Sequence, residues 1–430
     1  MNNAEKTDLK GRVGAGIKRR YRSEAIFRAM GLGALLVGLA FLAFFFYSLI
    51  VNGYTAFQQT RIQLDIEYSA DVLDPSGNRD PEMIRRADFS ALVRASLMAK
   101  FPDVTSRGDL RQLFAMMSAG AEMELRDRVL DDLDRIGSSE SIWLLADDEI
   151  DMVIKGYIDR DIDEGLRRIN DQQLGWLDAL DAERRVDLKF NRYFFTSGDS
   201  TDPELAGIWG ATVGSFFMLL VTLALSFPLG VATAIYLEEF ASRNRWTDII
   251  EVNINNLAAV PSIVFGLLGL SLFINVFGLP RSAPLVGGFV LSLMTLPVII
   301  IASRAALTAV PPSIREAALG LGASKMQVVF HHVMPLAMPG MLTGTIIGMA
   351  RALGESAPLL MIGMVAFIVD IPVSPLDKST ALPVQVYLWA DSPERAFVER
   401  TSAAILVLLA FLLLMNLTAV LLRKRFERRY

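Results

Sequence analysis

The stretch REAALGLGASKMQVVFHHVMP, residues 315–335, interrupts a chain in which 52% of the residues are hydrophobic. It lies between two strongly apolar segments and carries Arg315, Glu316, Lys325 and both histidines of the protein. Alanine and glycine make up five of its first ten residues. A polar stretch of small residues between apolar segments indicates a structured loop that joins two membrane spans.

This loop is predicted to form two short helices joined by a glycine turn. Ser313-Ile-Arg-Glu316 has the spacing of a capping box that opens the first helix. Gly320 and Gly322 suit a helix stop and a bend with positive φ. Ser324-Lys-Met-Gln327 is a second capping box, which opens the next helix. Two prolines are expected to break that helix before the next span: Pro335 and Pro339.

The composition divides the chain between lipid and water. Mean hydropathy is +0.39, yet 21% of the residues are charged, a mixture that fits neither a soluble protein nor a chain made only of spans. The absence of cysteine excludes disulfides, thiolate metal sites and thiol catalysis. Both histidines lie in one loop, which argues against a histidine-built metal or acid–base site. We therefore expect no metal and no cofactor.

Six segments are long and apolar enough to span a bilayer, which needs about 20 residues. They are residues 30–51, 208–237, 249–277, 285–302, 341–368 and 402–422. The expected fold is an all-α integral membrane protein with six transmembrane helices. Pro228, Pro261 and Pro297 lie within these segments, either as bend points or as kinks that neighbouring helices tolerate.

Basic residues set the expected orientation. Arginines and lysines crowd residues 1–29 ahead of the first span, so this tail is expected in the cytoplasm. Six spans return the C-terminus to the same side, in agreement with the basic tail at 423–430. The loop at 303–339 then faces the cytoplasm, whereas residues 52–206, 278–284 and 370–400 face the other side.

Residues 52–206 are predicted to form an inserted, mainly α extracytoplasmic domain. Ser106-Arg-Gly-Asp109 is typical of a helix start, and a 3.6-residue apolar stripe runs from there to Ile136. Helices are also expected near 147–156 and 172–182, and a strand at 186–195. Residues 61–204 hold 32 acidic and 19 basic residues, a net charge of −13. We interpret the acidic faces as a solvated surface rather than a cation site.

The segment GMLTGTIIGMARALGESAPLL, residues 340–360, carries two charges at membrane depth. Gly340, Gly344 and Gly348 form a row of small residues that favours close helix packing. Arg351 and Glu355 follow near that face. A charge inside a membrane is costly, so it pairs with a neighbour or lines a pathway. Two hypotheses stay open: a mutual Arg351–Glu355 pair that fixes the helix, or an arginine that meets an oxyanion in transit.

The loop resembles the EAA motif of ABC-importer permeases. Five residues fall in register with that motif: Glu316, Ala317, Ala318, Gly322 and Pro335. The family's hydrophobic pair is replaced by His332 and Met334. The residues alone left open whether Glu316 only caps a helix or whether the helix docks into a partner. The resemblance implies a coupling helix that contacts an ATPase subunit, in a type I (MetI-like) permease core at 207–422.

RALGESAPLL also resembles the corresponding span of phosphate-importer permeases of the PstA type. Supporting similarities are Pro228-Leu-Gly230, Ala234–Glu239 and Ala259–Gly266. The resemblance covers about residues 205–430 and not the domain at 52–206.

This resemblance implies a permease that moves inorganic phosphate across a bacterial inner membrane. The implied partners are a second permease (PstC type), a homodimeric ATPase (PstB type) and a periplasmic phosphate-binding protein (PstS type), with no nucleic acid. The chain has no Gly-x4-Gly-Lys-Ser/Thr loop, so ATP hydrolysis is assigned to the partner and the chain is no enzyme itself. Alternatives are another oxyanion, molybdate or sulfate, and a membrane sensor.

Overall fold

The computed structural model describes residues 3–365 and 367–426. The predicted basic tails fall partly outside this range: residues 1–2 and 427–430 are not described, nor are the side-chain surroundings of Arg12, Lys18 and Arg19. The chain divides into two compact units, Met1–Asn52 and Gly53–Tyr430.

The first unit is a single helix, α1 (Asn3–Gly53), whose last residue belongs to the second unit. Apolar side chains surround its second half, and most of them are exposed in the single chain. A helix that is apolar all round is suited to lipid or to another helix rather than to water.

The second unit begins with a domain built on a three-stranded antiparallel sheet, which we call the sheet domain (residues 54–205). Its strands are β1 (Gln58–Glu67), β2 (Ser139–Leu145) and β3 (Val186–Phe190), in the order β2-β1-β3. Strand β1 alternates, so that Ile62, Leu64 and Ile66 are fully buried on one face. These side chains form the core of the domain with residues of α4 and α6.

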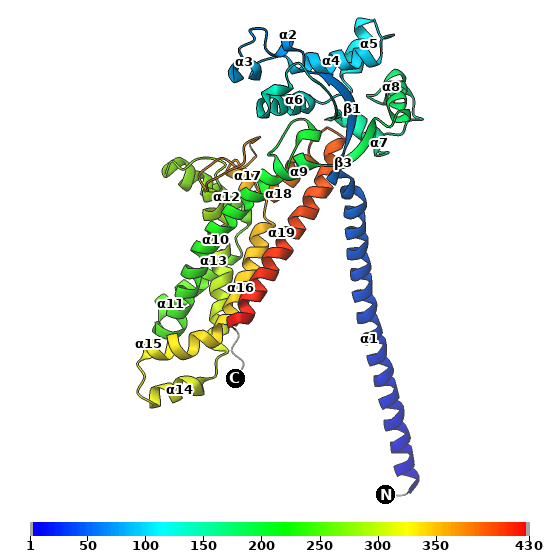
Figure 1. The fold of residues 1–430 in the computed structure, drawn as a ribbon. Helices are drawn as coiled ribbons and strands as arrows, with labels where there is room; N and C mark the ends of the chain where they lie inside the picture. Colours follow the sequence, from blue (N-terminus) through cyan, green and yellow to red (C-terminus); the bar gives the residue numbers. More distant parts are fainter. Residues whose placement is uncertain (1–2, 366, 427–430) are drawn as a thin grey trace. The chain divides into compact units, whose positions relative to one another are not determined.

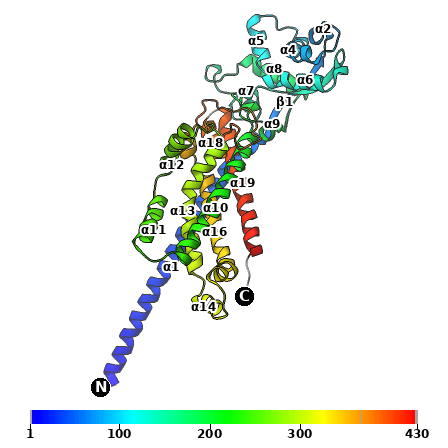
Figure 2. The same cartoon turned by 90° about the vertical axis from the view of Figure 1, so that its left-hand side faces the viewer.

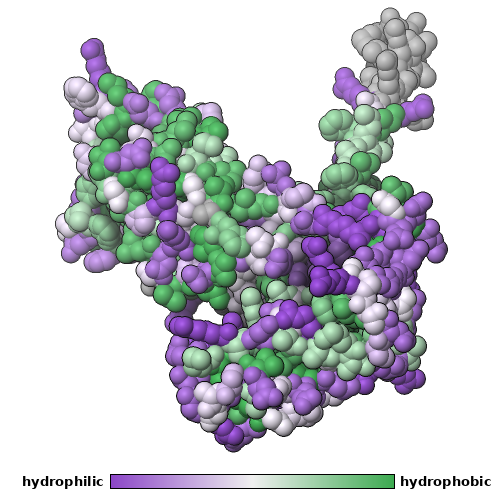
Figure 3. Space-filling model, turned by 90° about the horizontal axis from the view of Figure 1, so that it is seen from above, coloured by the Kyte–Doolittle hydropathy of each residue, from purple (hydrophilic) through white to green (hydrophobic). Residues whose placement is uncertain are grey.

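Helices cover that buried face (Figure 1). The longer ones are α4 (Phe89–Lys100), α5 (Arg107–Phe114), α6 (Ala119–Asp131), α7 (Asp148–Ile154) and α8 (Asp171–Ala182). Shorter elements are α2 (Ala70–Leu73), α3 (Pro81–Arg85), α9 (Arg192–Thr196) and the 3-10 turns η1 (Tyr54–Phe57), η2 (Leu133–Arg135), η3 (Glu164–Leu166) and η4 (Pro203–Leu205). Seen from above, the surface is a mosaic of hydrophilic and hydrophobic side chains (Figure 3).

The predicted mainly helical class is confirmed, but two of the three strands of the small sheet, β1 and β2, were not predicted. Its strands pair across long sequence separations, with Leu64 opposite Ile142 and Arg61 opposite Asp187, and local periodicity does not reveal such pairing. The strand predicted at 186–195 ends at Phe190, since the Asn191 side chain caps α9 by accepting from the Phe194 N–H. The apolar stripe predicted up to Ile136 is divided among α5, α6 and η2.

The remaining elements form the helical core. They are α10 (Trp209–Ile235) with the π segment η5 (Tyr236–Phe240), α11 (Arg245–Ala258), α12 (Ser262–Leu268) with the π segment η6 (Gly269–Val276), α13 (Pro284–Thr308), α14 (Pro312–Gly320), α15 (Lys325–Gln327), the π segment η7 (Val328–Val333), α16 (Met334–Leu353), α17 (Ala357–Met361), α18 (Leu382–Ala390) and α19 (Ala396–Phe426). In the described part of the chain, five helices are long and apolar enough to cross a membrane, or six if α11 and α12–η6 count as one span.

The span predicted at 249–277 is not straight. The helix breaks between Ala258 and Ser262 and turns by 103°. Pro261 lies at this break, since it has no backbone N–H to continue the helix and disfavours helical geometry at Val260. Pro228 and Pro297, by contrast, lie inside the continuous helices α10 and α13.

The helix that corresponds to the span predicted at 341–368 begins before residue 341 and ends before residue 368. Pro335 and Pro339 do not break the helix: Lys325–Leu353 is one continuous helical stretch. Pro335 occupies the first turn of α16, where no N–H is needed, and the wider π turns of η7 precede it. The helix ends at Leu353, followed by Gly354 and by Pro358 at the start of α17.

Helix α13 lies at the centre of the core, packed against α10 and α16. The predicted row of small residues on α16 forms the second contact: a Cβ added to Gly344 would lie 2.2 Å from the Ala302 Cβ, and one added to Gly340 would lie 2.6 Å from the Ala306 Cβ. Only glycine therefore allows this approach. Figures 1 and 2 agree that α14 lies at the end of the core opposite the sheet domain.

Candidate functional site: the α14 loop and the charged end of α16

Helix α14 begins differently from the prediction. Its N-cap is Pro311 and Pro312 is its first residue, so Ser313 is already helical and caps nothing. The predicted Ser313–Glu316 capping box is therefore wrong. The reason is that a proline pair presets helical entry one residue earlier than the serine would. Glu316 is left without the capping role that was one of its two hypotheses.

The five residues of the motif divide between the surface and the core. Glu316 and Ala317 are exposed, whereas Ala318 is buried among Val310, Val328 and Val329. Leu319 and Leu321 are also exposed, at 53% and 90%. One face of α14 thus holds the loop to the core, and the other presents a carboxylate with apolar neighbours, a combination typical of a protein-contact surface.

The turn after α14 is formed as predicted. Gly322 has φ +85°, which favours glycine, and the Ala323 N–H donates to the Ala318 carbonyl. The Ser324–Gln327 capping box is confirmed, with both of its hydrogen bonds present. Pro335 lies in the first turn of α16. The long helix from Lys325 therefore connects this turn directly to Arg351.

The side chain that anchors α14 was not identified from the sequence. The Arg315 guanidinium donates to the Glu239 carboxylate at 2.7 and 3.2 Å and to the Val310 and Leu307 carbonyls at 2.7 and 2.9 Å. Nearby, Arg304 donates to Glu251 at 2.7 Å. These contacts join α14 to α13 and to the end of α10. The adjacent pair Glu238-Glu239 was the available signal, since carboxylates at the end of an apolar segment need a partner.

Arg351 lies at the end of α16, and Glu355 just beyond it. The Arg351 Nε is 3.6 Å from the Glu355 Oε1, and 52% of the arginine side chain is exposed against 22% of the glutamate. Arg351 is not buried in the α13–α16 contact, so half of its side chain is accessible from outside the chain. The structure brings these two residues together but does not bring them near the α14 motif, which lies at the other end of α16 (Figure 1).

Charged residues also gather where the sheet domain meets α19. Lys155 is buried, with its Nζ 2.7 Å from the Asp151 Oδ2 and 2.8 Å from the Glu399 Oε1. Asp151 also accepts from the Thr60 N–H and hydroxyl. Helix α7 and the start of α19 are therefore joined by two buried ion pairs of Lys155, and strand β1 is joined to them by two hydrogen bonds of Thr60.

A group of carboxylates lies beside this junction. Asp148, Glu149 and Glu394 are close enough to share a cation, but Arg168 lies 3.3 Å from Glu149 and 2.5 Å from Glu394 and supplies the compensating charge. Burial and the Asp148 charge raise the pKa of Asp147 to about 8, and burial raises the pKa of Glu204 to about 7. Two carboxyl groups at this junction, Asp147 and Glu204, are therefore partly or largely protonated at neutral pH.

Long apolar helices that pack together, with a polar helical loop between two of them, define a multi-pass membrane protein. Residues 226–430 match the family described as "Binding-protein-dependent transport system inner membrane component". Residues 14–164 match a second family, described as a domain of unknown function (DUF3333).

Proteins of similar sequence identify a family within this class. Over 217 residues the chain is 34% identical to the "Phosphate transport system permease protein PstA 1" of Mycobacterium tuberculosis (strain CDC 1551 / Oshkosh), covering 50% of this chain and 70% of that protein. It is 30% identical over 227 residues to the PstA protein of Haemophilus influenzae, covering 52% and 78%. The chain belongs to the PstA-type family of ABC importer permeases.

One solved structure with a similar fold is an inward-facing form of the MetNI methionine ABC transporter, 19% identical, which covers 52% of this chain and 95% of that chain at a TM-score of 0.42. At this score the likeness carries no argument of its own. The predicted class, a helical ABC importer permease core with a mainly helical additional domain, is confirmed by the family and the helices, with the small sheet as the difference.

Proposed function

We propose that this permease translocates inorganic phosphate into the cytoplasm, driven by ATP hydrolysis on a separate subunit. The observation that carries the proposal is 34% identity, over half of the chain, to a phosphate permease. The proposed partners are a second permease, a homodimeric ATPase and a phosphate-binding protein, all of the kinds that the resemblance implies. The proposed orientation places both termini and α14 in the cytoplasm and the inserted domain at 52–206 on the other side.

The loop supports the coupling part of the proposal. Glu316 and Ala317 are exposed on α14, with Gly322 allowing the sharp return of the chain and Ala318 holding the helix to the core. α14 lies at the end of the core away from the sheet domain, as coupling on the cytoplasmic side requires (Figure 2). In this proposal the ATPase grips the exposed face of α14.

Arg315 provides the route by which movement of α14 reaches the spans. Its bonds to Glu239, Val310 and Leu307 mean that α14 cannot shift without pulling on α10 and α13 or breaking four hydrogen bonds. The continuous helix from Lys325 to Leu353 carries displacement from the loop toward Arg351. Packed helices that rock between two arrangements are a common form of such a switch.

Arg351 is proposed to contact the anion in the pathway. A guanidinium presents paired N–H donors that match phosphate oxygens, and this one is half exposed with its partner carboxylate at 3.6 Å. At that distance Glu355 can hold the arginine between transport events and release it to an oxyanion.

Uptake of radiolabelled phosphate by cells with and without this chain tests the substrate. Phosphate import is expected only in cells that contain the chain, and an excess of unlabelled phosphate, but not of molybdate or sulfate, should abolish it. Import that molybdate or sulfate abolishes would assign the permease to that oxyanion instead.

A further inference from the structure

A groove of about 730 Å³ opens on the sheet domain beside β3. Among its lining residues are four cations and two aromatic side chains: Arg61, Arg128, Lys189, Arg192, Trp143 and Phe190. Glu140 is the one carboxylate among the described lining residues. This concentration of positive charge is unexpected in a segment whose net charge is −13.

Two of the four cations are engaged within the domain. Arg61 donates to both carboxylate oxygens of Glu124, at 2.8 and 3.0 Å, and Arg128 lies 3.6 Å from Glu140. Lys189 instead places its Nζ 3.7 Å above the Trp143 ring, and neither Lys189 nor Arg192 forms an ion pair with a described carboxylate. These two charges are available to an anion from outside the chain.

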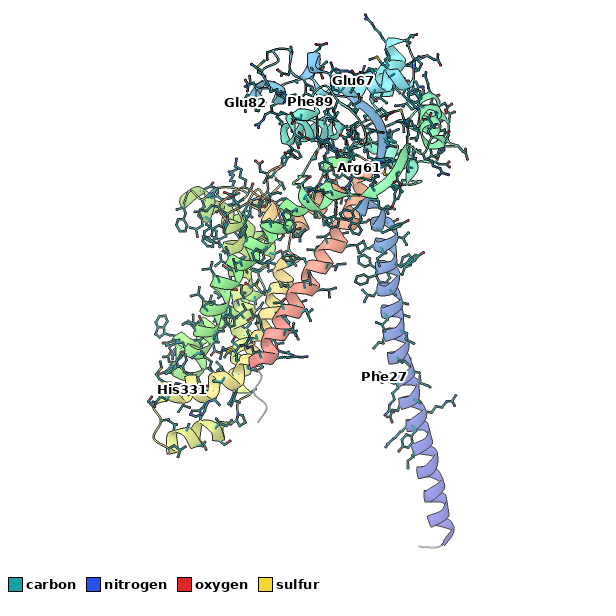
Figure 4. All side chains as sticks on the ribbon, viewed as in Figure 1. Phe27, Arg61, Glu67, Glu82, Phe89 and His331 are labelled. Carbon is teal, nitrogen blue, oxygen red and sulfur yellow. The ribbon has the colours of Figure 1, made fainter. Side chains whose placement is uncertain are left out.

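A stack of phenylalanines connects the groove to the beginning of a membrane span. Phe190, which lines the groove, stacks on Phe195 with ring centroids 5.4 Å apart, and Phe195 stacks on Phe57 at 5.5 Å. The carbonyl of Phe194, the residue before Phe195, accepts from the Ile208 N–H at 2.8 Å, one residue before α10 begins. Figure 4 places Arg61 at the end of the sheet domain nearest the helical core, with Glu67 and Glu82 farther away.

Exposed aromatic residues lie in the chain segments next to the end of α1 and before the start of α10. Phe190, Tyr54, Trp209 and Phe195 are 66%, 55%, 45% and 37% exposed, in a region where the apolar core of α10 starts. Aromatic side chains gather where hydrocarbon meets the lipid headgroups. Cations just beyond such side chains lie at the depth of the lipid phosphates, where each contributes to binding an anionic surface.

We propose that this groove binds the headgroup of an anionic phospholipid of the adjoining leaflet. Lys189 and Arg192 contact the phosphate, while Phe190 lies at the boundary with the acyl chains. Inorganic phosphate presents the same kind of anionic oxygen atoms to these two cations. A lipid, unlike inorganic phosphate, also brings apolar surface that the Phe190 and Trp143 rings, which line the same groove, can cover.

The experiment uses the full chain with its partner subunits, reconstituted in nanodiscs of equal phosphatidylglycerol and phosphatidylethanolamine, extracted into detergent and analysed for retained lipid by native mass spectrometry. The double variant Lys189→Gln/Arg192→Gln is expected to retain about tenfold less phosphatidylglycerol, since each basic residue at an anionic surface contributes several-fold. The matched control is Arg107→Gln/Arg111→Gln on α5, which removes two exposed cations of the same domain and should retain lipid as the wild type does.

Two outcomes overturn the proposal. One is equal retention of phosphatidylglycerol by the wild type and the double variant. The other is displacement of the lipid by inorganic phosphate more strongly than by sodium chloride of the same ionic strength, which would assign the groove to a free anion. Where the double variant does not fold, Arg192→Gln alone, at an exposed position, tests the same claim with an expected loss of about threefold.

Discussion

Arg315 and Glu316 are neighbours in the sequence but have opposite surroundings. The Arg315 guanidinium is tied to Glu239 and to two carbonyls, whereas the Glu316 side chain is exposed beside Leu319 and Leu321. A carboxylate with no structural task on an exposed helix is free to recognise a partner. Arg315 therefore anchors α14 to the core, whereas Glu316 is its proposed contact with a partner.

Charge reversal at Glu316 tests that contact. Glu316→Lys is expected to leave membrane insertion and thermal stability unchanged, because the side chain is exposed, and to abolish most ATP-driven uptake by repelling the ATPase surface that received the carboxylate. Uptake and ATPase activity are measured in proteoliposomes. Glu82→Lys, an exposed reversal on α3, is the control and should behave as wild type. Full uptake by Glu316→Lys would contradict the docking role.

Arg351 can be separated from a merely structural partner of Glu355 by comparing two neutral variants. If the arginine contacts the anion, Arg351→Gln lowers uptake at least about tenfold with an unchanged melting temperature, whereas Glu355→Gln retains most of it. If the pair only fixes the helix end, both variants lose stability alike and by little, since the pair is half exposed at 3.6 Å. Wild-type uptake by Arg351→Gln would show that Arg351 has only a structural role.

Glu204 predicts a pH dependence of stability. Burial raises its pKa to about 7 from 4.5 in the unfolded chain. Between these values the folded state keeps a proton that the unfolded state releases, so the free energy of unfolding falls as pH rises and is level above about pH 7. Glu204→Gln keeps the neutral form and should be more stable than wild type at pH 8, by at most about 3 kcal/mol, but not at pH 4.5.

Melting temperatures of the detergent-solubilised chain at the two pH values measure this difference. The exposed Glu82→Gln serves as the control, because its carboxylate has no buried charge to remove. An identical pH profile for Glu204→Gln and the wild type would show that Glu204 ionises freely in the folded protein.

At the scale of elements, the features predicted from the sequence are those that depend on residues close together in the chain. Ser106 and Ser324 begin helices as predicted, because a side-chain cap needs only the next three residues. The apolar spans were found because lipid imposes their length. The prediction that Ser313 caps a helix was wrong for an equally local reason, because Pro311 and Pro312 begin α14 before it.

What could not be predicted depends on residues far apart in the chain. Strand β1 pairs with residues of β2 and β3 that lie from 72 to 132 positions away, and its alternation was not recognised without them. At the candidate site, the motif residues were identifiable, but the Arg315–Glu239 anchor spans 76 positions. The 103° bend after α11 marks where a proline overrides a continuous apolar pattern.

The pair between α7 and α19 makes an element-scale prediction. Lys155, Asp151 and Glu399 are 1%, 9% and 3% exposed, so Lys155→Met leaves two buried carboxylates facing each other and should destabilise the chain by about 3–5 kcal/mol. Lys100→Met is the matched control, since its partner Glu183 is half exposed and such pairs contribute about 1 kcal/mol or less. Equal melting temperatures of the two variants would show that the sheet domain and α19 are not coupled through this pair.

At the scale of the whole molecule, the sheet domain is attached to the core at several places. Phe194 packs with Ile208, Trp389 and Phe397, the Lys155–Glu399 pair bridges to α19, and β1 and β3 run side by side where they enter the domain. The sheet domain is therefore one continuous segment of the sequence, yet it packs against the helical core. A deletion that ignores these contacts would damage the core and say nothing of the role of the domain.

The strand pairing shows where to cut. Thr60 on β1 lies opposite Leu188 on β3, so residues 61–187 can be replaced by Asn-Gly, a two-residue hairpin turn, while Phe194 and its packing stay in place. The deletion removes Lys155, the ion-pair partner of Glu399, so it is made both with and without Glu399→Gln. The shortened chain is expected to insert and to melt cooperatively. Copurification with the partner permease then decides the role of the domain: a folded shortened chain that pairs and transports makes the domain dispensable for import, and one that folds but no longer pairs makes it an element of assembly. Failure of both versions to fold would contradict the independence of the helical core.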